Sequence, residues 1–267
     1  MRKLIYFLVL SMLLIGCKSN AESDNAEQNK AQTVQAPENI SFQVLNMFPH
    51  DTSSYTQGLI WHEGKLWEGT GWKTESKLML TDLKTGKAIK SVKLPDTEFG
   101  EGITILNNKI YQLTWEDHKV YVYDLKTLKQ EKVFDWPYEG WGITTDGKAL
   151  LVSTGGSNLY WVDPATFKIT KTLGVSDNNG YVSNLNELEW VNGFIYANQY
   201  LTDYILKIDP SSGSVVGRIN LAGLLQQSNQ LIVANTDVLN GIAFNPTTGH
   251  FLVTGKRWPA LYELKLN

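Results

Sequence analysis

The chain has few of the groups that carry most enzymatic chemistry. Its single cysteine, Cys17, has no partner for an internal disulfide. The four histidines show no HxxxH or other metal-ligand spacing, and the sequence contains no P-loop and no G-x-S-x-G elbow. These histidines are His50, His62, His118 and His250. We therefore expect no metal site and no cofactor, so any reaction must depend on carboxylates, amides and aromatic rings.

An excess of charge of either sign is also missing. The 24 Lys and Arg residues against 27 Asp and Glu residues give a formal net charge of −3. Basic residues are scattered along the chain rather than clustered. The sequence gives no electrostatic reason to bind nucleic acid or an anionic membrane surface. We expect a monomer with no nucleic-acid partner.

A long apolar run occurs at the beginning of the chain. Residues 1–16 carry two early basic residues and then this apolar run, the pattern of a secretory signal too short to span a bilayer. The run ends in Leu-Ile-Gly before Cys17, and this junction resembles the lipobox of bacterial lipoproteins. We expect a lipid at Cys17 that anchors the protein to a membrane of the bacterial cell envelope, periplasmic or facing the outer membrane. An ordinary signal peptide followed by an incidental cysteine is the alternative.

The remaining chain divides into a polar segment and a globular one. Residues 17–39 lack aromatic residues and are rich in Asn, Gln, Ala and Glu, so they cannot bury much apolar surface. We expect them to form a flexible tether that begins with the lipidated cysteine. Residues 40–267 are long enough for one all-β domain with a full core.

Five similar segments recur in this globular part at a period near 45 residues. They are SYTQGLIW, EFGEGITIL, YEGWGITTD, NLNELEWV and VLNGIAFN. The same slot in each holds Gln57, Glu101, Trp141, Asn186 and Asn240. A repeat of this length indicates a repeat architecture, and equivalent positions in a closed ring of repeats converge on one axis.

Each unit contains short strand-like runs separated by turn residues, which predicts four antiparallel strands per unit. We therefore predict a five-bladed β-propeller over residues 40–267. The fifth unit is one strand short, and we expect residues 40–48 to complete it as its outer strand, which closes the ring and leaves no open edge. A solenoid is the alternative, but it would need capping repeats, and none are visible. Residues 221–230 form an insertion in which we expect a short helix.

Blade geometry brings a set of side chains to one mouth of the central channel. Because strands one and two of a blade are antiparallel, the start of the first and the end of the second open on the same face. That mouth collects Gln57, Glu101, Trp115, Trp141, Asn186, Tyr200 and Lys256. Aromatic walls with a few convergent polar groups are typical of a site for a small molecule or a peptide terminus.

Most of these residues also have a structural interpretation. The two Trp side chains could fill the core, Asn186 and above all Asn240 could bond backbone groups, and Lys256 could be solvated. The glycines in EGI, WGI and NGI would let strands pack closely around a narrow axis. Glu101 is harder to explain this way, because a carboxylate on a channel-lining strand is costly to bury unless it is paired. A single carboxylate that shuttles a proton suits a reaction such as the intramolecular attack of an amine on an amide.

Several segments resemble the signature segments of the plant- and bacterial-type glutaminyl-peptide cyclotransferases. They are SYTQGL, EFGEGIT with YQLTW, EGWGIT, LNELEW, and VLNGIAF with VTGKRWP, and the match runs from about Ser53 to Leu264. The resemblance implies a five-bladed propeller that converts the N-terminal glutamine of a peptide or protein to pyroglutamate and releases ammonia. It also implies that Glu101 matches the family's catalytic glutamate.

The resemblance extends to the pocket of that family. Positions that match it are Gln57, Trp115, Trp141, Asn186 and Lys256, while Tyr55 and Phe99 fall where the family also places aromatic residues. Glu187 is a further candidate for substrate binding. The family commonly has Trp at the position of Tyr200, so one indole wall is a phenol here.

Two other functions remain open on the sequence alone. One is a non-enzymatic, lipid-anchored binding or scaffold protein of the envelope, because propellers host many functions. The other is a calcium-dependent, lactonase-type hydrolase. That reaction would need several carboxylates at the channel, where only Glu101, with Glu187 nearby, qualifies.

Overall fold

The computed structural model describes residues 35–228 and 232–267. The predicted signal segment 1–16, the lipidation site Cys17 and the predicted tether up to residue 34 lie outside the described residues. Within the described part, no helix is both long enough and apolar enough to cross a bilayer.

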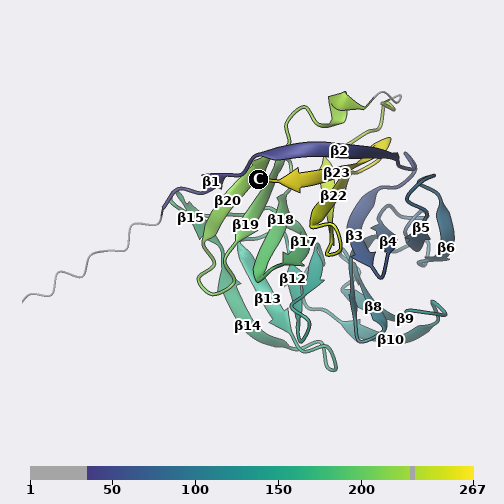
Figure 1. Cartoon of the computed structure of the whole chain (residues 1–267). Coiled ribbons are helices and arrows are strands. Elements are labelled where there is room, and N and C mark those ends of the chain that lie inside the picture. Colours follow the sequence, from purple (N-terminus) through teal and green to yellow (C-terminus); the bar gives the residue numbers. More distant parts are fainter. Residues whose placement is uncertain (1–34, 229–231) are drawn as a thin grey trace, which may run out of the picture. The chain divides into compact units, whose positions relative to one another are not determined.

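Each of the five sequence repeats forms one blade (Figure 1). Blade one consists of β3 (Thr56–His62), β4 (Lys65–Thr70), β5 (Lys77–Thr81) and β6 (Ala88–Lys93). Blade two consists of β7 (Gly100–Leu106), β8 (Lys109–Thr114), β9 (Lys119–Asp124) and β10 (Gln130–Asp135). Blade three consists of β11 (Ile143–Thr145), β12 (Leu150–Ser153), β13 (Asn158–Val162) and β14 (Ile169–Gly174). Blade four contains β17 (Leu185–Val191), β18 (Phe194–Gln199), β19 (Tyr204–Ile208) and β20 (Val215–Asn220), and blade five contains β21 (Leu239–Asn245), β22 (His250–Gly255) and β23 (Ala260–Leu266).

The inner strands form a closed ring, which confirms the predicted propeller. Strand β3 contacts β7, β7 contacts β11, β11 contacts β17, β17 contacts β21, and β21 returns to β3. The last blade is completed by β2 (Phe42–Pro49), which pairs antiparallel with β23 from Phe42 opposite Leu266 to Pro49 opposite Ala260. In Figure 1 this N-terminal strand runs beside the C-terminal one. The predicted closure by residues 40–48 is therefore confirmed.

Three elements lie outside the four-stranded pattern. Strand β1 (Glu38–Asn39) adds to blade four by pairing parallel with β20, so two residues before the predicted boundary at residue 40 also belong to a blade. A hairpin of β15 (Ser176–Asp177) and β16 (Gly180–Tyr181) lies between blades three and four in the chain and was not predicted. The insertion contains the short 3-10 helix η1 (Leu225–Gln227), and residues 229–231 of it lie outside the described part.

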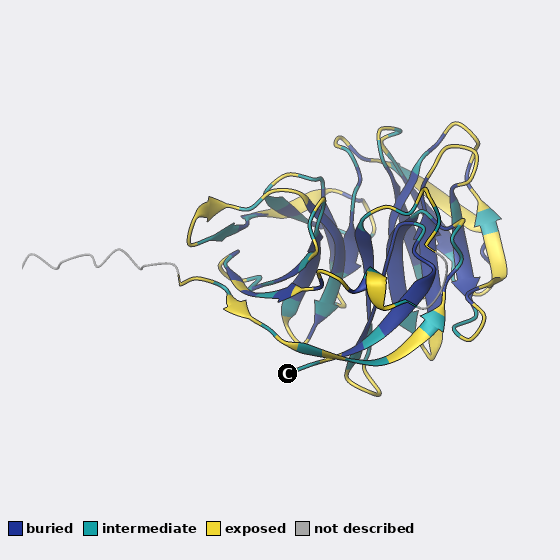
Figure 2. Ribbon diagram, turned by 90° about the horizontal axis from the view of Figure 1, so that it is seen from above, coloured by how far each residue is buried: buried dark blue, intermediate teal, exposed yellow. Residues whose placement is uncertain are grey.

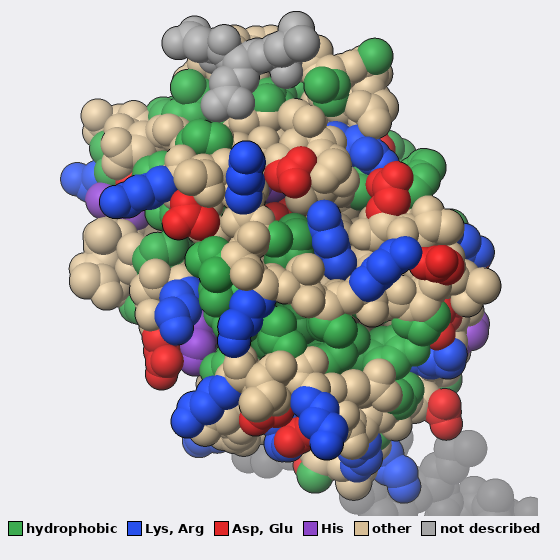
Figure 3. All heavy atoms as spheres, turned by 90° about the vertical axis from the view of Figure 1, so that its right-hand side faces the viewer, with side chains coloured by type: hydrophobic (Ala, Val, Ile, Leu, Met, Phe, Trp, Pro, Cys, Tyr) green, Lys and Arg blue, Asp and Glu red, His purple; other side chains and the backbone are tan. Residues whose placement is uncertain are grey.

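Burial decreases from the inner strand of a blade to its outer strand (Figure 2). Every residue of β7 is buried, whereas most of β6 and β10 is exposed. The cores lie between neighbouring blades, because the faces of twisted sheets pack against each other. One such cluster joins Ile60 and Leu78 of blade one to Ile103 and Ile110 of blade two. On the face in Figure 3, basic and acidic side chains are interspersed.

The turn after the third strand is built in the same way in four blades. An aspartate accepts hydrogen bonds from the backbone N–H and the hydroxyl of a Thr or Ser two or three residues later, the arrangement of an Asx turn. The pairs are Asp82 with Thr85, Asp124 with Thr127, Asp163 with Thr166, and Asp209 with Ser211. These repeated turns account for the similar hairpin in each of these blades.

Glycines allow the inner strands to approach closely at the axis. A Cβ atom on Gly102 would lie 2.6 Å from the carbonyl oxygen of Trp141, and one on Gly142 would lie 2.0 Å from that of Asn186. Any larger residue would force the blades apart. The sequence interpretation of the EGI and WGI glycines is confirmed, and this packing also sets the position of the side chains next to them.

Candidate active site

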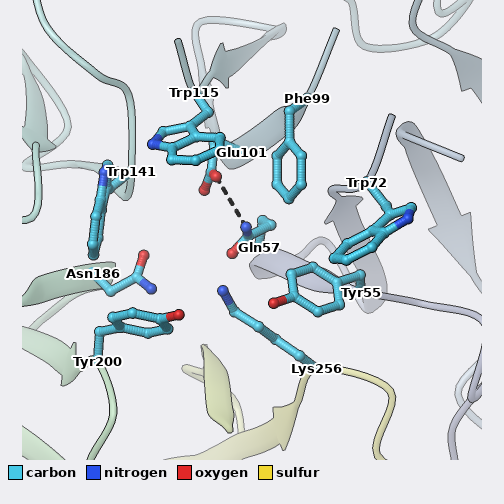
Figure 4. A pocket seen from close by; sticks show the side chains of 10 residues that line it. All are labelled: Tyr55, Gln57, Trp72, Phe99, Glu101, Trp115, Trp141, Asn186, Tyr200 and Lys256. Atoms are coloured by element: carbon cyan, nitrogen blue, oxygen red, sulfur yellow. Dashed lines mark hydrogen bonds between the residues drawn. The ribbon is translucent and has the colours of Figure 1, made fainter. Parts of the chain in front are cut away.

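A cavity of about 260 Å³ opens where the inner strands begin and the second strands end (Figure 4). It is lined by Tyr55, Gln57, Trp72, Phe99, Glu101, Trp115, Trp141, Asn186, Tyr200 and Lys256. Nine of these ten residues were predicted from the sequence, and Trp72 was not. Ligand pockets commonly measure about 300–1,000 Å³, so this cavity suits a small group, such as one amino-acid residue.

Glu101 lies on β7 with its carboxylate buried in the cavity. The side-chain amide of Gln57 donates a hydrogen bond of 2.9 Å to its Oε1 atom. Burial raises the pKa of Glu101 well above its usual value; the charge of Lys256 opposes this shift, and that of Glu139 adds to it. A carboxyl group whose protonated form is favoured in this way can accept a proton from one group and return it to another.

Asn240 orients the amide that holds Glu101. Its Nδ2 atom donates to the backbone oxygen of Thr56 at 3.0 Å and to Oε1 of Gln57 at 3.2 Å. The second contact leaves the Nε2 atom of Gln57 to face the carboxylate. The backbone-bonding role expected for Asn240 is confirmed. Through Gln57 the residue also helps to orient the carboxylate of Glu101.

Lys256 lies buried between two phenol rings. Its Nζ atom is 4.8 Å from the ring centre of Tyr55 and 5.0 Å from that of Tyr200. Burial lowers the pKa of Lys256, while the charges of Glu101 and Asp237 oppose that shift. The solvated alternative for this lysine is therefore wrong, because cation–π contacts and burial hold its ammonium group in the cavity wall.

One carboxylate fixes two of the three indoles that line the cavity. Oε2 of Glu139 accepts a hydrogen bond from Nε1 of Trp115 at 2.8 Å and one from Nε1 of Trp141 at 2.9 Å. Glu139 was not among the predicted site residues, although it stands two residues before Trp141 in the repeated segment. The two rings therefore form walls of the cavity rather than filling the core. Gly155 leaves room for the ring of Trp141, because a Cβ atom at this position would lie 2.6 Å from it.

The opposite wall is a chain of aromatic contacts. Phe99 lies edge-on to Trp115 at 5.7 Å between ring centres and to Tyr55 at 6.1 Å. The hydroxyl of Tyr55 donates to Oδ2 of Asp237 at 2.7 Å, a second partner that the sequence did not reveal. Burial and this hydrogen bond raise the pKa of Tyr55. The phenol therefore stays neutral, and its ring is fixed toward Lys256.

Asn186 and Glu187 are neighbours in sequence with different positions. The Oδ1 atom of Asn186 is buried at the cavity and has no hydrogen-bond partner, so it can accept one from a ligand. Glu187 does not line the cavity. Its two carboxylate oxygens accept hydrogen bonds from the backbone N–H groups of Ile242 at 2.8 Å and Leu59 at 3.2 Å, which lie in blades five and one. Successive side chains of a strand point to opposite faces, so Glu187 faces away from the cavity that Asn186 lines. It connects blade four to blades one and five. The expectation that Glu187 contributes to the pocket is therefore wrong.

The acidic residues in the described part of the chain do not form a metal-binding group. Among residues 35–228 and 232–267, no three His, Cys, Asp or Glu side chains gather closely enough to hold a metal ion. Glu101 is the single acidic residue among those that line the cavity. The arrangement is one carboxylate with an ammonium, two side-chain amides and aromatic walls.

Comparisons with known proteins agree with this geometry. A family model described as glutamine cyclotransferase matches residues 9–266. A glutaminyl-peptide cyclotransferase of Arabidopsis thaliana is 41% identical over 230 residues, which cover 84% of this chain and 71% of that protein. The crystal structure of Myxococcus xanthus glutaminyl cyclase matches with a TM-score of 0.80 at 32% identity, covering 86% of this chain and 98% of that one. The chain belongs to the glutamine cyclotransferase family.

Proposed function

We propose that the protein is a glutaminyl-peptide cyclotransferase, which converts an N-terminal glutamine to pyroglutamate and releases ammonia. The observation that carries the proposal is Glu101, a buried carboxylate of raised pKa in a cavity with room for about one residue. The reaction is an intramolecular aminoacyl transfer. The substrate supplies its own nucleophile, so the protein needs to fold the glutamine back on itself and to move one proton.

The aromatic walls would supply the first requirement. A free glutamine side chain is flexible, and confining it between fixed rings brings the α-amine close to the γ-carbonyl carbon, an effect that can contribute about 7–11 kcal/mol in favourable cases. Trp115 and Trp141 are fixed by Glu139, which suits them to this role. The unpartnered Oδ1 atom of Asn186 would accept a hydrogen bond from an N–H of the substrate.

Glu101 would supply the second requirement. The neutral α-amine attacks the γ-carbonyl carbon, a C–N bond forms, and Glu101 takes a proton from the attacking nitrogen. It then delivers that proton to the side-chain nitrogen as the original C–N bond breaks, so that ammonia leaves. The negative charge that develops on the carbonyl oxygen would be stabilised by donors from Lys256, Gln57 or Asn186, each worth about 2.7–4 kcal/mol.

An ammonia-release assay tests the proposal. The purified protein should release ammonia from Gln-Gly above the uncatalysed rate, and N-acetyl-Gln-Gly should be inert because its α-nitrogen is no longer nucleophilic. Ammonia from the acetylated peptide would indicate an amidase instead. Activity should persist in EDTA; loss in EDTA with recovery on addition of zinc would contradict a reaction carried by Glu101. No ammonia from any peptide with a free N-terminal glutamine would favour a non-enzymatic binding protein.

The lactonase-type alternative finds little support in the described residues. It needs several carboxylates around the channel mouth, but Glu187 is held by two backbone amides away from the cavity.

We also infer that Cys17 carries a lipid that holds the enzyme at a membrane of the bacterial cell envelope. The support is the sequence alone: a short apolar segment that ends in Leu-Ile-Gly before Cys17. In a bacterial host, the full chain should sediment with membranes, and Cys17→Ala should move the enzyme to the soluble fraction. Equal membrane association of both forms would contradict the anchor.

A further inference from the structure

Trp72 presents a half-exposed indole at the mouth of the cavity. It lines the same cavity as Glu101, yet 48% of its surface is exposed. Its ring lies 5.2 Å from the ring centre of Tyr55 and 6.3 Å from that of Phe99 (Figure 4). The cavity wall therefore continues outward as an apolar surface that water covers only in part.

The backbone holds Trp72 in a conformation that large residues seldom adopt. Its φ angle is +88°, in the region that favours glycine. Its carbonyl oxygen accepts three hydrogen bonds, from the backbone N–H groups of Glu75 at 3.0 Å and Ser76 at 2.8 Å and from the Ser76 hydroxyl at 2.8 Å. An unfavourable backbone held by several contacts occurs often at functional sites. Here it fixes an indole in a place that ordinary packing does not require.

The guanidinium that lies against this indole is paired with a carboxylate. The guanidinium of Arg257 lies 5.6 Å from the ring centre of Trp72 and 5.7 Å from that of Tyr55, and it donates to Oε2 of Glu75 at 3.1 Å. Because Glu75 balances the charge of Arg257, this guanidinium adds no net charge beside the apolar face of Trp72.

We propose that Trp72 forms a subsite for the second residue of the substrate peptide, and that it favours an apolar or aromatic side chain there. The inference rests on the proposed function, since the cavity must hold the N-terminal glutamine. The rest of the bound peptide then extends out through the mouth, where the side chain of the second residue can lie on the exposed face of Trp72. Leu201 is also exposed near the mouth, following Tyr200, but it does not line the cavity.

A set of dipeptides measures this preference. The values of kcat/KM are compared for Gln-Phe, Gln-Leu, Gln-Gly, Gln-Glu and Gln-Lys. We expect Gln-Phe to exceed Gln-Gly by about tenfold, the size expected for one aromatic contact with its buried area. Gln-Leu should fall between them, and neither charged peptide should exceed Gln-Leu.

Variants of Trp72 then test which side chain is responsible. In Trp72→Ala the ratio of Gln-Phe to Gln-Gly should fall to about twofold or less, and Trp72→Phe should keep most of it. A ratio between two substrates of one variant cancels any general loss of activity. Tyr181→Ala removes a phenol that is 82% exposed on the hairpin β15–β16, and this matched control should keep the wild-type ratio.

Trp72→Gly separates the subsite from a purely structural role. Glycine accepts a positive φ, so this variant should withstand heat better than Trp72→Ala while losing the same preference.

The outcomes distinguish the inference from the proposed function. If no glutaminyl dipeptide is cyclised, the proposed function fails. If Gln-Gly is cyclised but Gln-Phe is no better, or if Trp72→Ala keeps the wild-type ratio, the function stands and the subsite is wrong. A clear preference for Gln-Glu or Gln-Lys would show that charge selects the second residue and would also overturn the subsite.

Discussion

Gln57 donates a hydrogen bond of 2.9 Å to Glu101 across the boundary between blades one and two. Both residues occupy the same slot of the sequence repeat, and the ring of inner strands brings them together. The donor is a neutral amide, so it orients the carboxylate without the full charge compensation of an ion pair. Burial can therefore keep the pKa of Glu101 well above its usual value.

The first prediction concerns the rate. Glu101→Gln keeps the shape of the side chain but cannot carry a proton, and general acid–base catalysis is typically worth about 10²–10⁴ in rate. We expect kcat to fall by at least that order with KM changed far less, because the aromatic walls remain. Steady-state kinetics with Gln-Gly measures both constants. Glu187→Gln is the matched control and should lower stability rather than turnover; near-normal kcat in Glu101→Gln would show that the carboxylate is structural.

The second prediction concerns stability: the same substitution, Glu101→Gln, that lowers the rate should make the folded protein more stable. The folded protein keeps the proton of Glu101 at pH values where the unfolded chain has lost it, so stability falls as pH rises from the ordinary carboxyl range through the raised folded pKa. Glu101→Gln removes this cost, about 1.4 kcal/mol for each unit by which the pKa is raised.

Thermal unfolding at several pH values measures the difference. The Tm of Glu101→Gln should exceed that of the wild type at pH 8, and the two should converge near pH 4. A variant that is less stable than the wild type at pH 8 would show that ionised Glu101 is well compensated in the fold.

Much of this fold could be predicted because the repeat imposes it. Short alternating runs and turn residues mark the strands, and a unit one strand short requires a partner, which β2 supplies. The hairpin of Ser176–Asp177 and Gly180–Tyr181 could not be predicted, because two-residue strands carry no periodicity and occur outside the repeat.

Site residues that occupy equivalent positions of the repeat could be predicted. Residues that lie outside those positions, or that contact the lining residues without lining the cavity themselves, could not. Glu101 and Trp141 share one slot, so the fold brings them together. Trp72 lies just after a predicted strand, in a loop whose positive φ no sequence pattern indicates. Glu139 and Asp237 do not line the cavity but accept hydrogen bonds from its aromatic residues, and such pairs depend on three-dimensional packing.

The third prediction concerns the closure of the ring. Deleting residues 35–49 should lower Tm by more than about 10 °C or prevent folding, because it removes the outer strand of blade five and leaves an open edge. Deleting residues 18–33 should leave Tm unchanged. A milder variant, Phe48→Ala, should cost about 2 kcal/mol, since Phe48 packs on the core cluster around Leu59 and Leu261. Equal stability of both truncations would contradict closure by β2.

The last prediction separates the two effects of Glu139, which holds Trp115 and Trp141 and adds negative charge near Glu101. Glu139→Gln keeps an oxygen that can accept from both indoles but loses the charge. Because that charge helps burial to raise the pKa of Glu101, the acidic limb of the kcat/KM profile should move to lower pH, with KM near that of the wild type. Glu139→Ala should move the same limb in the same direction and also raise KM by about tenfold, because both indoles lose their partner. The profiles are measured with Gln-Gly between pH 5 and 9. An unchanged KM in Glu139→Ala would show that packing alone holds the indoles, and an unmoved acidic limb in both variants would show that Glu101 does not control it.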